Sequence, residues 1–338
     1  MTTVGVVAPG AMGTALGRCL AEGGHRVLTS LAGHSGDTVA RARGVFEDAG
    51  GLEDLVRAAD VVLLVVPPGA ARAAGDTLAA ACEATGARPL TVEMDAVSPD
   101  TVRAVAERLP GDLVDGAISG PPPRPDASTP TRVFLSGPRA GDVAALAAPG
   151  VRWIVLDGPV GAASAAKMCT ASVRKGYQAL LAQAFVTADA HGVLDEVLAD
   201  VRLDFPGAGV ASAAVAATKA WRFVDEMTEI AATQEAAGLP PALAEGLAEA
   251  YRALATSGWG TRRPDEVPPD LADPADLRPR RHGGDASGET DRIPRSVTSE
   301  GARAVTPRAL PSPEHLATAG VLRPVEGRGP DAPGGFFS

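Results

Sequence analysis

The chain has 338 residues, enough for two domains with substantial cores. Its formal net charge of -10 and the absence of a basic patch exclude a general nucleic-acid binder, because nothing would neutralise the phosphates. The three cysteines are widely spaced without a C-x-x-C pair, so the sequence indicates neither a disulfide framework nor a zinc site. With no apolar run near the roughly 20 residues that cross a bilayer and no secretory leader, we expect a cytoplasmic protein without a membrane partner.

The first element is a buried strand at residues 4–8, followed by a glycine turn and a helical pattern through Leu20. In the dinucleotide-binding pattern G-x-G-x-x-G the first glycine is replaced by Ala8, while the second and third are retained. A tight structural turn is the alternative, but the position at the start of a strand-turn-helix unit favours a cofactor role. The loop residues expected to contact the cofactor are Pro9, Gly10, Ala11, Met12 and Gly13.

The second strand, at residues 26–30, ends where NAD-dependent enzymes place a carboxylate for the ribose 2'-hydroxyl. Here no carboxylate occurs before Asp37, and Arg41 and Arg43 lie nearby. Hydroxyls, an imidazole and arginines suit a 2'-phosphate, so we predict NADP, with NAD as the alternative. Plain loop residues beside a solvated helix face are the structural alternative. The candidate cofactor residues in this segment are Ser30, His34 and Ser35.

Residues 61–66 form a continuous aliphatic run that ends at Pro67, as is typical of a central parallel strand covered on both faces. Helical patterns separate it from the strands before and after it. This alternation predicts a doubly wound sheet. The further strands are expected at residues 90–94, 114–118, 132–135 and 152–156.

Ser119 and Gly120 follow one of these strands, at the sheet edge where ligands bind in open α/β folds. Their backbone amides and the serine hydroxyl are suited to cradle a carboxylate. A loop stiffened by the three prolines at residues 121–123 is the alternative.

Lysine occurs only three times in the chain, as Lys167, Lys175 and Lys219. Lys167 follows small residues at 161–166 that would let a helix start pack tightly against a ligand or a neighbouring backbone. An ammonium in a partly dry site exchanges a proton near neutral pH, which makes Lys167 a catalytic candidate. A surface position is the alternative for Lys167. For Lys219 a solvated helix position is expected, with a place in the substrate cleft as the alternative.

From residue 161 the chain is alanine-rich and helical, with further helices expected at 193–201, 210–236 and 242–254. Beyond residue 258 the composition shifts, and twelve of the 29 prolines lie there. Such a segment buries too little apolar surface to offset its ordering entropy, so we predict a disordered tail.

Taken together, the motifs resemble the β-hydroxyacid dehydrogenase superfamily, which includes 6-phosphogluconate dehydrogenase and 3-hydroxyisobutyrate dehydrogenase. Within it, the chain is most similar to a bacterial branch with a small helical C-terminal domain. The resemblance covers about residues 3–255. Its four segments occur in the family's order, at residues 5–13 (G-V-V-A-P-G-A-M-G), 60–67, 115–120 (D-G-A-I-S-G) and 161–167.

The resemblance implies an NADP-dependent dehydrogenase or reductase for a small hydroxy acid or its keto counterpart. Lys167 would be the general acid/base, and Ser119 and Gly120 would bind the substrate carboxylate. Val66 and Pro67 would touch the cofactor. Family members pair through the helical domain, so the resemblance also implies a homodimer.

Three features depart from the family. An asparagine that helps to orient substrate is replaced by Ala171, which would line the substrate site. A family Asp-x-Asn pair is Glu93 and Asp95 here, and His34 stands where NADP-using relatives have an arginine. Imine reduction is an alternative, although that group commonly lacks the lysine. A catalytically inactive dinucleotide-binding protein is another, favoured by the missing asparagine.

The expected architecture is α/β, with a Rossmann-type doubly wound sheet followed by an all-helical domain and a disordered tail. We assign residues 1–158 to NADP binding, residues 159–257 to substrate binding and dimerisation, and residues 258–338 to the tail. The alanine-rich run at residues 179–190 has a small-residue surface compatible with close helix packing in a dimer.

Overall fold

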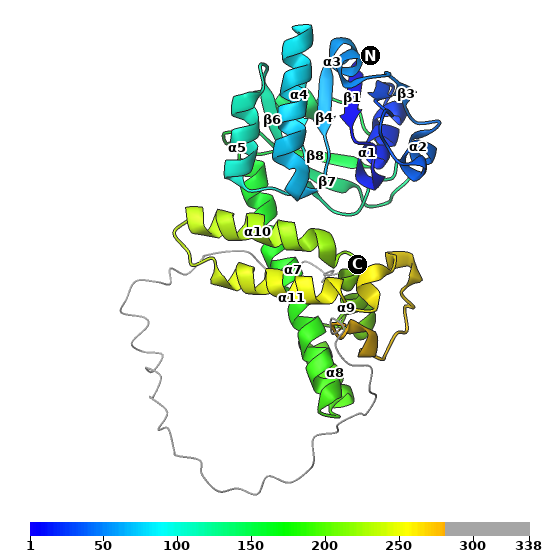
Figure 1. Ribbon diagram of the computed structural model, residues 1–338, viewed down its shortest axis with the longest axis vertical. Helices are drawn as coiled ribbons and strands as arrows, with labels where there is room; N and C mark the ends of the chain where they lie inside the picture. Colours follow the sequence, from blue (N-terminus) through cyan, green and yellow to red (C-terminus); the bar gives the residue numbers. More distant parts are fainter. Residues whose placement is uncertain (281–338) are drawn as a thin grey trace, which may run out of the picture. The chain divides into compact units, whose positions relative to one another are not determined.

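A computed structural model describes residues 1–280 (Figure 1). The part of the predicted tail at residues 281–338 lies outside the described residues. The described chain consists of an eight-stranded sheet with its covering helices, followed by a helical region.

The sheet has the strand order β3-β2-β1-β4-β5-β6-β7-β8. The first six strands are parallel, β7 is antiparallel to β6, and β8 is parallel to β7. The chain order reverses between β1 and β4, which is the point where ligands bind in doubly wound sheets. The strands are β1 (Thr3–Val7), β2 (Arg26–Thr29), β3 (Glu47–Asp48), β4 (Val61–Leu64), β5 (Leu90–Glu93), β6 (Leu113–Ser119), β7 (Thr131–Ser136) and β8 (Val151–Val155).

The predicted doubly wound sheet is confirmed, and β4 shows why its strands are continuously apolar. Val61 and Leu63 are buried in one hydrophobic cluster, while Val62 and Leu64 are buried in the other. Successive side chains point to opposite faces, so a strand covered on both sides must be apolar throughout. Strand β3 was not predicted, because its two residues, Glu47 and Asp48, are exposed and carry no hydrophobic pattern.

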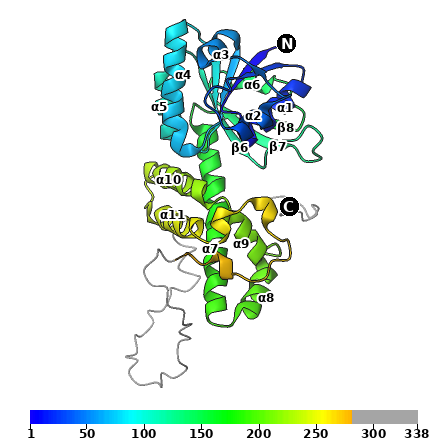
Figure 2. The ribbon, with the colours of Figure 1, turned by 45° about the vertical axis from the view of Figure 1, so that its right-hand side comes forward.

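Helices cover both faces of the sheet (Figure 2). Leu16 and Val143 belong to the cluster on one face, and Leu55, Leu78 and Val102 to the cluster on the other. The helices are α1 (Ala11–Glu22) and α6 (Ala140–Ala144) on the first face, α3 (Leu52–Ala58), α4 (Ala71–Thr85) and α5 (Pro99–Arg108) on the second, and α2 (Gly36–Ala42) after β2.

The helical region packs around a separate core that includes Phe185, Met227 and Tyr251. The prediction of a single helix at residues 210–236 is wrong, since the helix is interrupted at Thr218 and Lys219. Alanines on both sides of the break are buried, so the apolar pattern runs through it without a signal. The helices are α7 (Ala162–Ala190), α8 (Leu194–Asp204), α9 (Val210–Ala217), α10 (Ala220–Ala236) and α11 (Ala242–Ala255).

The prediction that disorder begins at residue 258 is wrong for residues 258–280. Short 3₁₀ turns form there, η2 (Trp259–Thr261), η3 (Pro264–Glu266) and η4 (Ala275–Leu277). Trp259 and Leu277 are 3% and 1% exposed, within the core of the helical region. The average composition of the segment did not predict this packing, because two large apolar side chains are enough to anchor a polar segment on a core formed by other helices. Across residues 1–280, no helix is long and apolar enough to span a membrane.

Candidate functional site

The glycine turn after β1 has the backbone geometry of a close-approach loop. Ala8 has φ +60°, in the left-handed region that favours glycine, and its carbonyl accepts from the Gly10 amide at 2.8 Å. A Cβ on Gly13 would lie 2.9 Å from the Ala8 carbonyl oxygen, so only glycine lets α1 pack this close. A Cβ on Gly10 would meet no atom within 4 Å. The second glycine therefore faces open space at the N-terminus of α1, where backbone amides favour an anion.

The segment after β2 is held by side-chain hydrogen bonds. Ser30 Oγ donates to the Gly50 carbonyl at 3.0 Å, and Ser35 Oγ accepts from the Thr38 amide as the N-cap of α2. Both serines thus have a structural role in addition to the predicted cofactor role. His34 and the two nearby arginines, Arg41 and Arg43, are exposed and free to meet a ligand.

A buried carboxyl pair lies at the carboxyl ends of β4 and β5. The Val66 amide donates to Asp95 Oδ1 at 2.5 Å, and the Asp95 amide donates to Glu93 Oε1 at 3.1 Å. Burial raises the pKa of Glu93 well above its usual value, and it raises the pKa of Asp95 to about 7. The second oxygen of each carboxyl is buried without a hydrogen-bond partner. The pair therefore holds a proton near neutral pH, and it accepts a hydrogen bond from the amide of Val66, the residue before Pro67.

Asp115, on β6, fixes the start of α7. Its Oδ2 accepts from the Gly161 amide at 2.9 Å, the Ser164 amide at 3.0 Å and Ser136 Oγ at 2.9 Å. Its Oδ1 accepts from Ser164 Oγ at 2.7 Å. A carboxylate here satisfies helix N-terminal amides and interacts favourably with the helix dipole. The aspartate of the D-G-A-I-S-G segment thereby sets the position of the lysine two turns into α7.

Lys167 reaches the end of β6 from the second turn of α7. Its Nζ donates to the Ile118 carbonyl at 2.8 Å, directly before Ser119 and Gly120. Desolvation lowers the pKa of Lys167, and the Coulombic attraction of Glu226 partly opposes that effect. The structure therefore brings the lysine and the predicted carboxylate loop together, although they are about 50 residues apart in sequence. Ala171, one turn further along, is buried in the helical core.

Sequence reasoning gave no role to Lys175 and did not single out Glu226. Lys175 is buried on α7 and forms an ion pair with Glu226 of α10. Burial lowers the pKa of Lys175 to about 8, with Glu226 acting in the opposite direction. The rarity of lysine was a signal for Lys175. No local signal marks Glu226, because the partners are 51 residues apart.

Lys219 is half-buried at the start of α10, so the expected solvated position is wrong. Burial lowers its pKa, and the charge of Arg222 one turn later adds to this effect. The helices on either side of Lys219, α9 and α10, both pack on α7, which the sequence pattern did not indicate.

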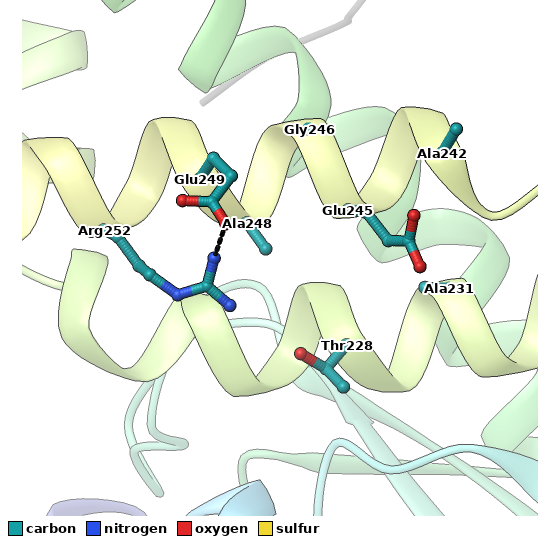
Figure 3. Close-up of a pocket in the computed structure, with 8 residues that line it drawn as sticks. All are labelled: Thr228, Ala231, Ala242, Glu245, Gly246, Ala248, Glu249 and Arg252. Carbon is teal, nitrogen blue, oxygen red and sulfur yellow. Dashed lines mark hydrogen bonds and ion pairs between the residues drawn. The ribbon is translucent and has the colours of Figure 1, made fainter.

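A hollow of about 550 Å³ lies between α10 and α11 (Figure 3). Its polar lining includes Thr228, Glu245 and the ion pair of Arg252 with Glu249. None of the residues predicted from the sequence lines it. Within residues 1–280, no group of three or more His, Cys, Asp or Glu side chains is arranged to hold a metal ion.

Comparison with known proteins agrees with this architecture. Residues 188–254 match a family model described as a domain of unknown function, DUF1932. No curated protein matches the chain. The solved structure of the conserved protein MTH1747, described as structurally similar to 3-hydroxyacid dehydrogenases, is 28% identical with a TM-score of 0.57, covering 75% of this chain and 96% of that one.

Two further structures extend the comparison. A conserved hypothetical protein from Sinorhizobium meliloti 1021 is 27% identical with a TM-score of 0.53, covering 75% of this chain and 88% of its own. The 3-hydroxyisobutyrate dehydrogenase of Mycobacterium tuberculosis, solved with L-serine, is 22% identical with a TM-score of 0.54. The match covers 82% of this chain and 98% of that one.

The sheet order, the glycine turn and the helical second region define a Rossmann-type α/β protein with a helical C-terminal domain. Its fold is similar to that of solved structures described as related to 3-hydroxyacid dehydrogenases, which supports the resemblance to the β-hydroxyacid dehydrogenase superfamily.

Proposed function

We propose that the protein is an NADP-dependent oxidoreductase that interconverts a small hydroxy acid and its keto counterpart, with Lys167 as the general acid/base. The observation that carries the proposal is the bond from Lys167 Nζ to the Ile118 carbonyl, which holds an ammonium beside the Ser119-Gly120 loop. A structural neighbour described as similar to 3-hydroxyacid dehydrogenases supports the same class of reaction.

The residues of the glycine turn fit a dinucleotide. Gly10 faces open space, and Gly13 brings α1 against the Ala8 carbonyl, so a pyrophosphate has access to the first amides of α1. We propose that Gly10, Met12 and Gly13 hold the pyrophosphate. The remaining contacts of a bound dinucleotide are assigned to Pro9, Ala11, Ser30, His34, Ser35, Val66 and Pro67.

The choice of NADP rests on the segment after β2. No carboxylate precedes Asp37 there, while His34, Arg41 and Arg43 are exposed and compatible with a 2'-phosphate. When bound, a nicotinamide cofactor accepts or supplies the hydride. Every other step assigned to the site is carried by the chain's own side chains and amides.

Lys167 exchanges the proton that accompanies the hydride. In oxidation its neutral amine takes the proton of the substrate hydroxyl, and in reduction its ammonium returns that proton to the carbonyl oxygen. Burial supports both roles, because the lowered pKa of Lys167 increases the fraction of neutral amine for oxidation and makes the ammonium a stronger acid for reduction. Ser119 and Gly120 bind the substrate carboxylate.

The test is turnover of NADPH and NADH with a panel of keto acids, hydroxy acids and imines. Lys167→Met is expected to reduce turnover by roughly 100-fold or more while leaving NADPH affinity nearly unchanged. Lys167→Arg is the matched control, because arginine keeps the charge but does not exchange its proton at neutral pH. Activity of either variant at the wild-type level would refute the acid/base role. Equal affinity for NADPH and NADH would remove the NADP assignment alone, and turnover of imines only would favour the imine reductase alternative.

We also propose a homodimer formed through α7. Ala179, Ala182 and Ala188 are buried within the protomer, so the small-residue run packs internally. Val173 and Leu180, seven residues apart on α7, are instead 74% and 57% exposed and form an apolar stripe. The molar mass in solution tests this proposal, and Val173→Glu with Leu180→Glu should give a monomer.

A further inference from the structure

The two lysines of α7 are close enough in sequence to act on one another. Lys167 and Lys175 are eight residues apart, so they lie about two turns apart toward the same side of the helix. Lys175 and its partner Glu226 have side chains that are 9% and 7% exposed, whereas the other ion pairs within residues 1–280 have at least one well-exposed partner. About two turns after Lys167, α7 therefore carries one member of an ion pair that is buried from water.

The surroundings of Lys175 fix it in place. Its Nζ lies 4.8 Å from the centroid of the Phe223 ring, and the Tyr251 hydroxyl donates to its carbonyl at 2.7 Å. Phe223 and Tyr251 are both buried. A buried ion pair adds little net stability compared with apolar side chains of the same size, because both charges lose their hydration. The ion pair lies about two helical turns from Lys167, so a role in the electrostatics of Lys167 would account for charged rather than apolar side chains at this position.

We consider next the charged and polar groups that act on Lys167. The hydrogen-bond partner of Lys167 is the Ile118 carbonyl of β6. The charge of Glu226 acts on both lysines and favours their protonated forms. The buried Asp115 of β6 directs its hydrogen bonds to β7 and to the first turn of α7. The charged groups that act on Lys167 are Arg174 on α7 and Arg222 and Glu226 on α10, and the charge of Lys167 in turn acts on Lys175.

We propose that Lys175 is a positioning residue for Lys167: by binding Glu226 in a buried ion pair, it keeps that carboxylate from pairing with Lys167 and leaves the Lys167 ammonium free to give up its proton. The proposal deepens the proposed function and rests on it for the catalytic role of Lys167. The physical reason is that two ammonium groups compete for one carboxylate. The ammonium without the carboxylate loses its proton more easily.

The test uses the scarcity of lysine. Protein labelled with ¹³C at lysine Cε gives three side-chain resonances, one for each lysine in the chain. Substitution of Lys219 by arginine removes one resonance and assigns it, and Lys167→Met assigns another. A pH titration of the remaining signals then measures the proton affinity of Lys167 directly, in the full chain and without a substrate.

Two single substitutions should move that affinity in opposite directions. Lys175→Met frees Glu226 to pair with Lys167, so the proton affinity of Lys167 should rise about tenfold or more. Glu226→Gln removes the attracting carboxylate, so the affinity should fall. The double variant Lys175→Met/Glu226→Leu replaces the pair by apolar side chains and should return Lys167 to within about threefold of wild type. Glu249→Gln, which breaks the exposed pair with Arg252 on α11, is the matched control and should change nothing.

An unchanged Lys167 titration in folded Lys175→Met and Glu226→Gln would overturn the proposal, as would a shift in the same direction in both. If Lys175→Met fails to fold, the opposite signs expected for Glu226→Gln and the restoring double variant still decide. The result is separable from the proposed function. Opposite shifts of the Lys167 titration in a protein without turnover would support the role of Lys175 and contradict the oxidoreductase assignment. Turnover with an unshifted Lys167 titration would support the oxidoreductase assignment and contradict the role of Lys175.

Discussion

Asp115 binds Ser164 twice, since Oδ1 accepts from the serine hydroxyl at 2.7 Å and Oδ2 from its amide at 3.0 Å. Both residues are completely buried. This contact joins β6, which carries the candidate substrate loop, to the first turn of α7, which carries Lys167. The geometry of the site therefore depends on a cap made by a strand, with no side-chain cap from the residue that precedes the helix.

Asp115→Asn should lower the free energy of unfolding by about 3 kcal/mol, because the substitution removes the charge that strengthens the accepted hydrogen bonds and replaces one acceptor oxygen by a nitrogen that cannot accept. Ser164→Ala should cost about 1 kcal/mol. Ser172→Ala is the control, since that hydroxyl donates only to the Cys169 carbonyl of its own helix and its loss should cost close to nothing. Urea unfolding measures all three. A cost for Asp115→Asn no greater than that of Ser172→Ala would contradict the capping role.

Ala8→Gly should stabilise the protein by up to about 1 kcal/mol. Among residues 1–280, Ala8 has the only positive φ at a non-glycine position, and the left-handed region costs an L-residue roughly 1–2 kcal/mol. The greater freedom of glycine in the unfolded chain cancels part of that gain. Thermal unfolding should show a higher Tm for Ala8→Gly and a lower Tm for Ala15→Gly in the interior of α1. A lower Tm for both would mean that Ala8 is not strained.

Asp95→Asn should remove a pH dependence of stability. The pKa of Asp95 is about 7 in the folded protein and about 4 in the unfolded chain, so the folded state binds more protons between these values. Wild-type stability should therefore fall as pH rises from about 4 to 7 and stay reduced above 7. The free energy of unfolding of the variant minus that of wild type should be about 2 kcal/mol larger at pH 8 than at pH 5. Parallel stability curves for the two proteins would contradict the raised pKa.

The segment at residues 258–280 should contribute to the stability of the helical region. A fragment of residues 1–257 lacks the buried side chains of Trp259 and Leu277, whereas a fragment of residues 1–280 retains them. Burying two such side chains contributes about 3–6 kcal/mol. The shorter fragment should unfold at a clearly lower temperature than the longer one, and Trp259→Ala in the full chain should reproduce part of the loss. Equal Tm values would show that the docked segment adds no stability.

The sequence by itself determined the parallel sheet and the location of Lys167. Strand β4 is recognisable because burial on two faces demands a continuous apolar run, and the glycine turn because close backbone approach excludes a Cβ at Gly13. These requirements act over a few neighbouring residues, so they leave a local pattern.

Only the tertiary structure decided which distant groups surround that lysine. Asp115 meets Ser164 across 49 residues, and Lys175 meets Glu226 across 51. Buried polar groups need partners of matching chemistry, but the partner's place in the chain follows from how helices dock on the sheet and on one another. Docking also buried Trp259 in a segment whose composition predicted disorder. Long-range pairing of this kind has no sequence period, and it sets the charges around Lys167.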